Sequence, residues 1–479
     1  MSAPRRVLPD AANRRGWCPS LARPMPTGDG LLARIHPPLG ILTPAQIRAV
    51  AAASRAFGNG HVDVTARANL QLRGVTEANR PALVAALGGA GLGDMRADGG
   101  PQRLTLTSPL AGLTGEAVDV RAMASAIEAH GLAIAGLPPK TLVLIEGGGT
   151  DLSGIAADIH VRATGPGIAA VGLADEAGVT WIATCDEART AEAVAGLLRA
   201  FATSGRRRIR DLADTERGSL VRALPAILAD APPPPSVGEC GPRSGSGEGS
   251  AGSGKGAPLS RPSLTRGPPS PARGEGKPAL SVEACSFLEV EAPFGRCTAA
   301  MLDRLAEVAD GLGIDEVRVS PTRGFVLPMR GVPSHRRGEP LADLAAAGFV
   351  TAPDDPRRAV ATCPGAPACA SGSTPTGADA ARLAEAFRPF AASGMTAHVS
   401  GCAKGCAHPA RADLTLVARD GRYGVVLDGS PGDAPALELT FDAALERVWR
   451  AKSGTLAQAF GPSPSPRQAF AEPAIGTTI

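Results

Sequence analysis

The chain has 479 residues, a formal net charge of +3 and 44% hydrophobic residues. This length predicts about three domains of roughly 150 residues each, and the apolar content is sufficient for folded cores. The small net charge, without a basic tract interleaved with aromatic residues, argues against a nucleic-acid-binding protein, and no apolar run reaches the ~18 residues that span a membrane.

The first patterned segment predicts strands on either side of a helix. Residues 30–36 are expected to form a strand, and Thr43-Pro44-Ala45-Gln46 is a capping box with proline at the first helical position. Residues 61–65 and 67–73 then alternate between apolar and polar side chains, which predicts two more strands. Upstream, Cys18 follows Trp17, and a lone cysteine in such a place is more often packed against its neighbour than part of a site.

Further along the chain, two basic residues occur in motif-like surroundings. Arg103 lies in Gln102-Arg-Leu-Thr-Leu-Thr-Ser-Pro109, and Lys140 follows Leu137-Pro-Pro. Only five of the 49 basic residues are lysines, so a lysine inside a motif is less expected to be arbitrary. A solvated lysine and an arginine in an ordinary salt bridge are the alternatives. Glycines 147–149 follow a predicted strand at 141–145 but lack the G-x-G-x-x-G spacing, which favours a turn.

Two segments have the composition of unfolded chain. Residues 230–279 consist of Gly, Ser, Pro and Arg with almost no apolar side chains, and they include Cys240. Such a segment cannot bury enough surface to offset its conformational entropy, so we expect a disordered linker. The last residues, 461–479, are rich in Pro, Ser and Ala and are expected to form a flexible tail.

The order of the first segment returns after the linker. Residues 287–290 and 316–320 predict strands, Thr298 can cap a helix between them, and residues 325–328 predict a third strand after a Thr-Arg turn. Both copies end in Arg-Gly-Val. This pattern predicts an internal duplication whose halves are joined by the linker.

Four of the nine cysteines gather between Cys363 and His408, as one C-x5-C and one C-x3-C pair. Each pair lies in Gly/Pro/Ala-rich sequence typical of loops, and a helix-like interval separates the pairs. Small residues between the ligands of each pair let the backbone curl so that several thiolates converge, as an iron–sulfur cluster requires. A zinc site, whose pairs are usually spaced C-x2–4-C, and inert buried thiols are the alternatives.

Cysteine usage also bears on location. The number of cysteines is odd, and the arginine-containing start is not followed by the apolar segment of an export signal. This combination favours reduced thiols and metal binding over disulfides. We therefore expect a cytoplasmic protein with no membrane and no nucleic-acid partner.

The cysteine spacing resembles the cluster motif of the sulfite/nitrite reductase superfamily. In that superfamily four cysteines hold a 4Fe–4S cluster, and the last one also bridges to a sirohaem iron. The resemblance implies that the cluster and metal ligands are Cys363, Cys369, Cys402 and Cys406, with Cys406 as the bridge. The stretch Ser-Gly-Cys-Ala-Lys-Gly-Cys-Ala-His-Pro is similar to the precorrin-3B synthase branch, whereas the reductases more often carry Pro-Asn in place of Ala403-Lys404.

The resemblance implies an α+β fold with a duplicated nitrite/sulfite reductase-like architecture. Two ferredoxin-like half-domains would each be followed by a larger α/β domain, and the second α/β domain would carry the cluster. The half-domains are expected at 16–80 and 280–335, and the α/β domains at 85–225 and 340–460.

The resemblance also implies which basic residues form the site. Thr65-Ala-Arg67 resembles the Thr-x-Arg turn of the first half-domain, Arg103 the arginine before the Ser-Pro segment, and Lys140 the first lysine of the Pro-x-Lys strand entry. Lys404, between two cluster cysteines, completes this catalytic set. The second lysine of the reductases corresponds here to Leu142, which weakens binding of a small oxyanion and argues against a reductase.

Membership of this branch would imply an iron–sulfur monooxygenase that uses O2 to hydroxylate precorrin-3A at C20 and closes a γ-lactone in aerobic cobalamin biosynthesis. The 4Fe–4S cluster would relay electrons, and an iron with an open position, either sirohaem or mononuclear non-haem iron, would activate oxygen. His398 and His408 are the imidazoles nearest to the cysteine pairs. No nicotinamide fingerprint is visible, so NADH-derived electrons are expected to arrive through a separate reductase.

Two other functional classes remain open at this point. A sirohaem-dependent sulfite or nitrite reductase would share the fold and the cluster motif, since a fold does not determine a function. A non-catalytic iron–sulfur or tetrapyrrole-binding protein is the third reading, and the retained Arg67, Arg103 and Lys140 argue against it.

Overall fold

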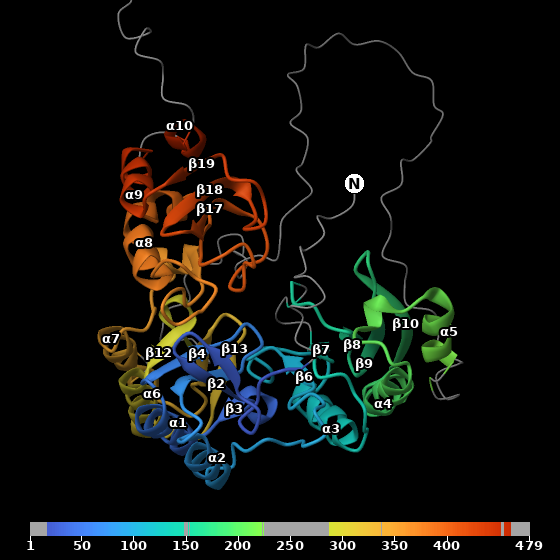
Figure 1. Ribbon diagram of the computed structural model, residues 1–479. Coiled ribbons are helices and arrows are strands. Elements are labelled where there is room, and N and C mark those ends of the chain that lie inside the picture. Colours follow the sequence, from blue (N-terminus) through green and yellow to red (C-terminus); the bar gives the residue numbers. More distant parts are fainter. Residues whose placement is uncertain are drawn as a thin grey trace, which may run out of the picture. The chain divides into compact units, whose positions relative to one another are not determined.

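The computed structural model describes residues 17–147, 152, 154–222, 224, 287–336, 338–451 and 455–460. The expected linker, with Cys240, and the expected tail lie outside these residues. The chain separates into two compact units, Met1–Pro353 and Asp354–Ile479, the second coloured orange to red in Figure 1. None of the described helices combines the length and apolar character that crossing a bilayer requires.

The first unit contains two copies of a strand–helix–strand–strand segment, as the sequence predicts. The first copy consists of β1 (Met25–Thr27), β2 (Gly30–Ile35), η2 (Pro38–Gly40), β3 (Ile41–Leu42), α1 (Pro44–Phe57), β4 (His61–Val64), β5 (Leu70–Val75) and α2 (Arg80–Gly89). The second consists of β11 (Phe287–Glu291), η6 (Pro293–Gly295), β12 (Arg296–Thr298), α6 (Ala299–Gly311), β13 (Val317–Ser320), β14 (Gly324–Pro328), η7 (Ser334–Arg336) and α7 (Glu339–Ala346).

Local sequence explains why the two copies begin their helices alike. The Thr43 hydroxyl accepts a hydrogen bond from the N–H of Gln46, and the Gln46 side chain accepts one from the N–H of Thr43. Thr298 accepts in the same way from the N–H of Met301. The expected capping of both helices is confirmed, and each cap satisfies N–H groups that the first helical turn leaves without partners.

Each copy contributes a short strand to the sheet of the other copy. The two sheets have the strand orders β1-β2-β5-β4-β12 and β11-β14-β13-β3, and both exchanged strands pair antiparallel with their new neighbours. Helices α1 and α6 pack side by side (Figure 1). One apolar core joins buried residues of both copies, such as Ile47, Val62, Leu302 and Val317, so the copies fold as one body.

Two further sheets share a plan of three parallel strands followed by two antiparallel strands. The first unit holds β6 (Thr105–Thr107), β7 (Val143–Glu146), β8 (Ile159–Gly165), β9 (Ile168–Ala174) and β10 (Val179–Asp186), with α3 (Val120–Leu132), α4 (Glu187–Thr203), η3 (Ile209–Asp211) and α5 (Asp214–Arg222).

The second unit repeats this plan. It holds β15 (Val360–Thr362), β16 (Ala397–Ser400), β17 (Ala412–Arg419), β18 (Arg422–Gly429) and β19 (Leu437–Leu439), with η8 (Pro356–Ala359), α8 (Thr376–Ala392), α9 (Phe441–Arg450) and α10 (Leu456–Phe460). The α+β fold with two half-domains and two larger α/β domains is therefore confirmed, while the residue boundaries expected for those domains stay a prediction.

One predicted strand begins later than expected. The alternation at 67–73 predicted a continuous strand, but β5 starts only at Leu70. Ala68 has a φ of 50°, in the left-handed region, and its N–H donates to the carbonyl oxygen of Thr65 over 2.9 Å. This tight turn delays the start of the strand, and Arg67 lies within the turn, as the resemblance of Thr65-Ala-Arg67 to a Thr-x-Arg turn implies.

Candidate active site

The four motif cysteines lie in two loops at one edge of the second unit's sheet. Cys363 follows β15 and Cys402 follows the neighbouring parallel strand β16. The carboxyl ends of neighbouring parallel strands meet at the same edge, so the loops that follow them face each other. Directly after β6 and β7 stand Ser108 and Gly147, where the second unit has Cys363 and Gly401. Of the two described copies of this sheet, the second carries the thiols.

Contacts within these loops bring the thiols to one region. The main-chain N–H of Gly401 donates to Cys363 Sγ over 3.2 Å. Burial raises the pKa of the Cys406 thiol, and the neighbouring Cys402, Cys363 and Cys369 raise that pKa further. All four sulfurs are therefore close enough to interact electrostatically.

The chemistry of these four side chains fits an iron–sulfur cluster. Four thiols from two neighbouring loops are the type of donor set that a 4Fe–4S cluster uses, with one thiolate on each iron. Among the residues that the structure describes, no group of three or more His, Cys, Asp or Glu side chains is arranged to hold one metal ion. The cluster and its four ligands stay a prediction.

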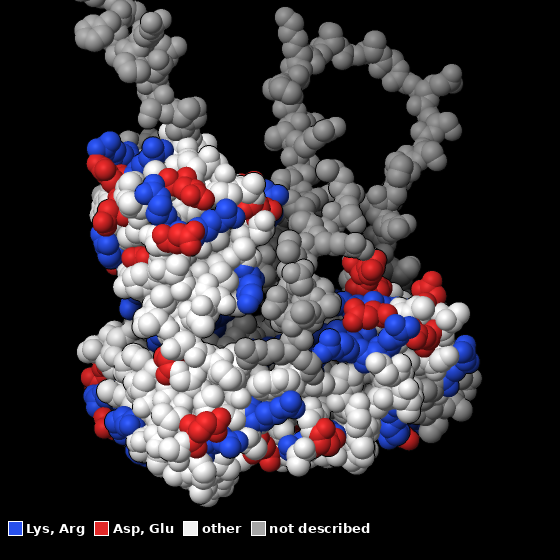
Figure 2. Space-filling model, viewed as in Figure 1, with Lys and Arg blue, Asp and Glu red and all other residues white. Residues whose placement is uncertain are grey.

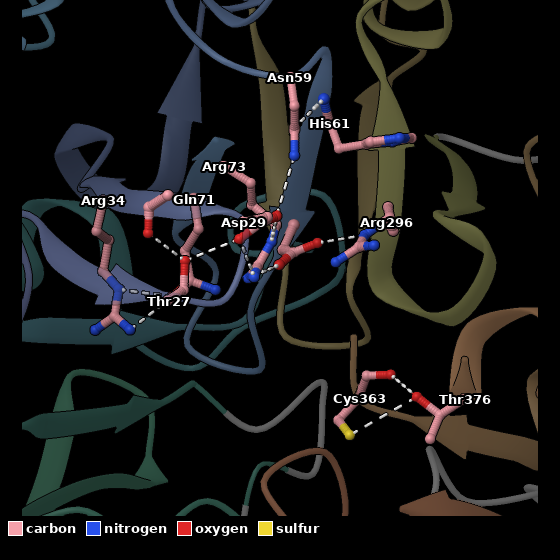
Figure 3. A network of polar contacts seen from close by, with 12 residues as sticks. Thr27, Asp29, Arg34, Asn59, His61, Gln71, Arg73, Arg296, Cys363 and Thr376 are labelled. Carbon is pink, nitrogen blue, oxygen red and sulfur yellow. Dashed lines mark hydrogen bonds and ion pairs between the residues drawn. The ribbon is translucent and has the colours of Figure 1, made fainter. Parts of the chain in front are cut away.

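Small residues allow the close approach of these loops. A Cβ atom on Gly401 would lie 3.2 Å from Cys363 Sγ and 3.4 Å from the Cα of Gly365. Thr376, the first residue of α8, donates to the carbonyl oxygen of Cys363 over 2.6 Å, and its hydroxyl lies 4.0 Å from Cys363 Sγ (Figure 3). The start of α8 and Gly401 thus hold Cys363 from two sides.

The two imidazoles near the cysteines contact each other. The rings of His398 and His408 form an edge-to-face pair with centroids 5.8 Å apart. His398 is fully buried on β16, and His408 Nε2 lies 3.1 Å from the carbonyl oxygen of Arg411. A role for either imidazole as an iron ligand stays a prediction.

A cavity of about 320 Å³ lies in the first unit, between the first copy and the segments that precede β6 and β7. Its lining includes the predicted Arg67 and Arg103 together with Leu142. In all, five arginines and two aspartates line it: Arg23, Arg34, Arg67, Arg96, Arg103, Asp94 and Asp98. The volume lies at the lower end of the range for ligand sites, and the excess of arginine favours an anionic ligand.

Two of these arginines donate only to neutral groups. Arg34 donates to Oε1 of Gln71 over 3.2 and 2.7 Å (Figure 3). Arg103 donates to the main-chain oxygens of Ala68 (2.9 Å), Pro37 (3.4 Å) and Arg67. In the described part of the chain neither guanidinium forms an ion pair, so their charges are available to a ligand.

Burial shifts the pKa values of these two guanidiniums. Burial lowers the pKa of Arg34, and the nearby Arg67 lowers it further. Burial, reinforced by Arg67 and opposed by Glu128, lowers the pKa of Arg103 to about 10. Arginine stays charged at neutral pH, and a carboxylate entering the cavity would relieve the repulsion of both residues from Arg67.

The two aspartates of the lining hold the cavity wall. Asp94 accepts hydrogen bonds from the Ser20 hydroxyl (2.6 Å) and from the N–H groups of Leu21 (3.0 Å) and Ala22 (2.8 Å). Asp98 pairs with Arg96 over 2.5 Å. Among the described residues, neither carboxylate forms an ion pair with Arg34 or Arg103.

Of the four basic residues predicted for the site, only Arg67 and Arg103 line the cavity. Lys140 is exposed and lies between two lining residues, Pro139 and Thr141, without lining the cavity itself. Lys404 belongs to the second unit, where it is exposed in the Cys402 loop and lowers the pKa of Cys406. Catalytic roles for these two lysines stay a prediction.

Among the polar residues of the cavity that the sequence did not single out are Arg34, His36 and Asn69. Arg34 and His36 alternate within the predicted strand 30–36, and Asn69 belongs to the polar face of the pattern at 67–73. The alternation marks these residues as polar positions but does not show that they line one cavity.

Comparison with known proteins identifies the family of this chain. A model of the nitrite/sulfite reductase ferredoxin-like half domain matches residues 23–90. A precorrin-3B synthase of a Sinorhizobium species is 32% identical over an alignment of 463 residues, which covers 92% of this chain and 89% of that protein. The chain belongs to the precorrin-3B synthase family.

This family lies within the nitrite/sulfite reductase superfamily. A ferredoxin–nitrite reductase of Synechococcus elongatus is 33% identical over 149 residues, or 29% of each chain. The structure of the Mycobacterium tuberculosis NirA protein matches with a TM-score of 0.62 and 21% identity, over 90% of this chain and 82% of that chain. At this identity the likeness to NirA establishes the fold.

Proposed function

We propose that the protein is a precorrin-3B synthase, which uses O2 to hydroxylate precorrin-3A at C20 and closes a γ-lactone with an acetate side chain. The observation that carries this proposal is the cavity in which Arg34 and Arg103 donate only to neutral groups. A corrin precursor carries many carboxylates, and arginine binds carboxylates through two parallel hydrogen bonds. The precorrin-3B synthase of Sinorhizobium supports the same reading.

Five residues in or beside the cavity have a proposed task. Arg34, Arg67 and Arg103 bind carboxylates and fix the orientation of the macrocycle, and Lys140, exposed beside the lining, meets a peripheral carboxylate. Leu142 is buried and gives the wall an apolar face where the reductases carry a second lysine. A small oxyanion such as sulfite would lack that cation, whereas a large ring gains an apolar contact.

The cysteine loops have a separate task. Cys363, Cys369, Cys402 and Cys406 would hold a 4Fe–4S cluster, which supplies single electrons when bound. The Gly401 N–H that donates to Cys363 Sγ would stabilise added negative charge at that sulfur. Lys404 places a positive charge beside Cys406. A cytoplasmic location would suit four thiols that must stay reduced.

The proposal includes two components beyond these residues. An oxygen-activating iron, sirohaem or mononuclear non-haem iron, completes the site, and a separate reductase delivers the NADH-derived electrons. Purified protein alone should therefore not oxidise NADH at a catalytic rate. Rapid oxidation of NADH without a partner would contradict a separate reductase.

The testing experiment combines anaerobic purification with iron and sulfide analysis, a visible spectrum and turnover of precorrin-3A under isotopically labelled O2. We expect about four irons and four sulfides per chain from the cluster, any further iron from the oxygen-activating site, and incorporation of one labelled oxygen atom into the product. Cys402→Ala should lose cluster iron, while Cys185→Ala, which changes a buried thiol of the first unit, should retain it.

The alternative enzyme is a sirohaem-dependent sulfite or nitrite reductase. The similarity to a ferredoxin–nitrite reductase supports this alternative. Strong sirohaem bands together with sulfite or nitrite reduction by reduced methyl viologen would favour that enzyme and contradict the oxygenase. A cluster without turnover of any of these substrates would favour a binding protein.

A further inference from the structure

His36 and Asn69 lie at neighbouring ends of two paired strands. Strands β2 and β5 pair Ile35 with Leu70 and Arg34 with Gln71. His36 directly follows β2, and Asn69 directly precedes β5. Both His36 and Asn69 line the cavity.

Polar atoms of both residues lack protein partners. His36 Nδ1 and Asn69 Oδ1 are buried and have no hydrogen-bond partner among the described residues, and the whole Asn69 side chain is only 7% exposed. A buried polar group without a partner has lost its hydrogen bonds to water and gained none in exchange, which is unfavourable. Two such atoms at one cavity wall indicate that a ligand completes their hydrogen bonding.

The charges that face His36 are mostly positive. Burial lowers the pKa of His36 well below its ordinary value, and Arg34 and Arg103 lower it further, so the imidazole is neutral in the free protein. The other charged or titratable residues of the lining are Cys18, Arg23, Arg67, Asp94, Arg96 and Asp98. Asp98 is paired with Arg96, and Asp94 accepts from neutral donors and keeps its charge, so the five arginines of the lining still outnumber its two aspartates.

We propose that His36 takes up a proton when the cavity binds a polycarboxylate, and that its Nδ1–H then donates to a ligand carboxylate. The ligand's negative charges cancel the repulsion from Arg34 and Arg103, and the carboxylate supplies the partner that Nδ1 lacks. This inference rests on the proposed binding of an acidic tetrapyrrole. In this role His36 binds the substrate and becomes protonated as the substrate binds.

Proton uptake at a binding site is linked to affinity. If His36 is neutral in the free protein and protonated in the complex, the complex binds more protons, so affinity rises as pH falls. Within the window between the two pKa values of His36, the binding constant should change by up to about tenfold per pH unit. A neutral imidazole that merely donates from Nδ1 would give no such slope.

The experiment is isothermal titration calorimetry of the purified full chain with uroporphyrin, an octacarboxylate porphyrin, at about pH 7 in buffers of different ionisation enthalpy. We expect an uptake of up to about one proton by the wild-type protein in excess of that by His36→Gln. His160→Gln is the matched control, because His160 is buried on β8 of the same unit and does not line the cavity. That control should keep the wild-type uptake.

The outcomes separate this inference from the proposed function. Binding with equal proton uptake in wild-type and His36→Gln protein would overturn the role of His36 alone. Failure of the wild-type protein to bind the porphyrin would contradict the proposed cavity and the inference with it. If His36→Gln does not fold, 15N NMR of the wild-type imidazole with and without porphyrin decides the question, and an imidazole that stays neutral in the complex overturns the inference.

Discussion

Arg296 Nε donates to Asp63 Oδ1 over 2.7 Å, although the two residues are 233 positions apart. Asp63 lies on β4 of the first copy and Arg296 on β12, the strand lent by the second copy. Asp63 also accepts from Arg73 over 3.2 Å, and Arg73 donates to Asp29 over 2.8 and 2.9 Å (Figure 3). A network of alternating charges therefore links β12 of the second copy to β4 and β5 of the first copy.

The first prediction concerns this network. Asp63→Asn should lower the free energy of unfolding by about 2–4 kcal/mol, because it leaves Arg296 and the buried Arg73 without a shared carboxylate. Chemical unfolding measures the change. Asp303→Asn is the matched control, because Asp303 pairs with Arg55 across the same two copies at a more exposed position and should cost about 0–1 kcal/mol. Equal losses would contradict the argument from burial.

A second prediction is the pH dependence of the same network. Burial opposes ionisation of Asp29, but hydrogen bonds from Arg73 and Thr27 outweigh it and hold the pKa below its ordinary value. Ionised Asp29 therefore stabilises the fold above its unfolded-state pKa of about 3.9, and this stabilisation is lost as the pH falls through the folded-state pKa.

Asp29→Asn should thus destabilise the protein by about 1–3 kcal/mol at neutral pH, and its difference from wild type should shrink below about pH 4. Unfolding curves at several pH values test this. Asp211→Asn, at the exposed end of η3, should have little effect at any of them. A constant difference for Asp29→Asn across the whole pH range would show that the carboxylate charge is not responsible.

A third prediction concerns the cysteine loops. Gly401→Ala should reduce iron and sulfide content, because its Cβ would lie 3.2 Å from Cys363 Sγ and would press the sulfur out of place. Gly377→Ala, on α8, meets no atom within 4 Å and should leave both contents unchanged. If Gly401→Ala assembles a full cluster with an unaltered reduction potential, the close approach at Gly401 is not needed to hold Cys363.

A fourth prediction concerns the cavity. Arg34→Gln should weaken binding of an octacarboxylate porphyrin by about ten- to hundredfold, since a charge-assisted hydrogen bond contributes about 1.5–3 kcal/mol. Fluorescence titration measures the affinity. Arg199→Gln makes the same change of charge at an exposed position on α4 and controls for long-range attraction. Equal losses in both variants would indicate that net charge alone, and no site at Arg34, governs binding.

On the face shown in Figure 2, basic and acidic side chains are interspersed and give no competing indication of a large anionic partner. Exposed ion pairs among the described residues include Arg304 with Asp343. Such pairs contribute little to stability. The concentration of arginine inside the cavity is therefore the more informative feature of the charge distribution.

Several features could be predicted because they depend on neighbours in the chain. The capping boxes at Thr43 and Thr298, the alternation of β2 and β5, and the loops around the cysteine pairs all arise from contacts within a few residues. The cysteine spacing was also enough to point to a cluster, because ligand type and spacing are written directly in the sequence. The order of elements in the two copies revealed the duplication for the same reason.

Other features were decided only by the tertiary structure. The exchange of β3 and β12, the burial of Arg103 on main-chain oxygens, and the meeting of His36 and Asn69 at one cavity join residues from about 30 to more than 200 positions apart. Strand pairing and burial depend on the packing of the whole unit, and no local pattern records which face of a strand meets solvent and which meets a cavity. The sequence by itself therefore determined most of the elements and predicted the thiol ligands, and the fold determined which polar side chains line the cavity.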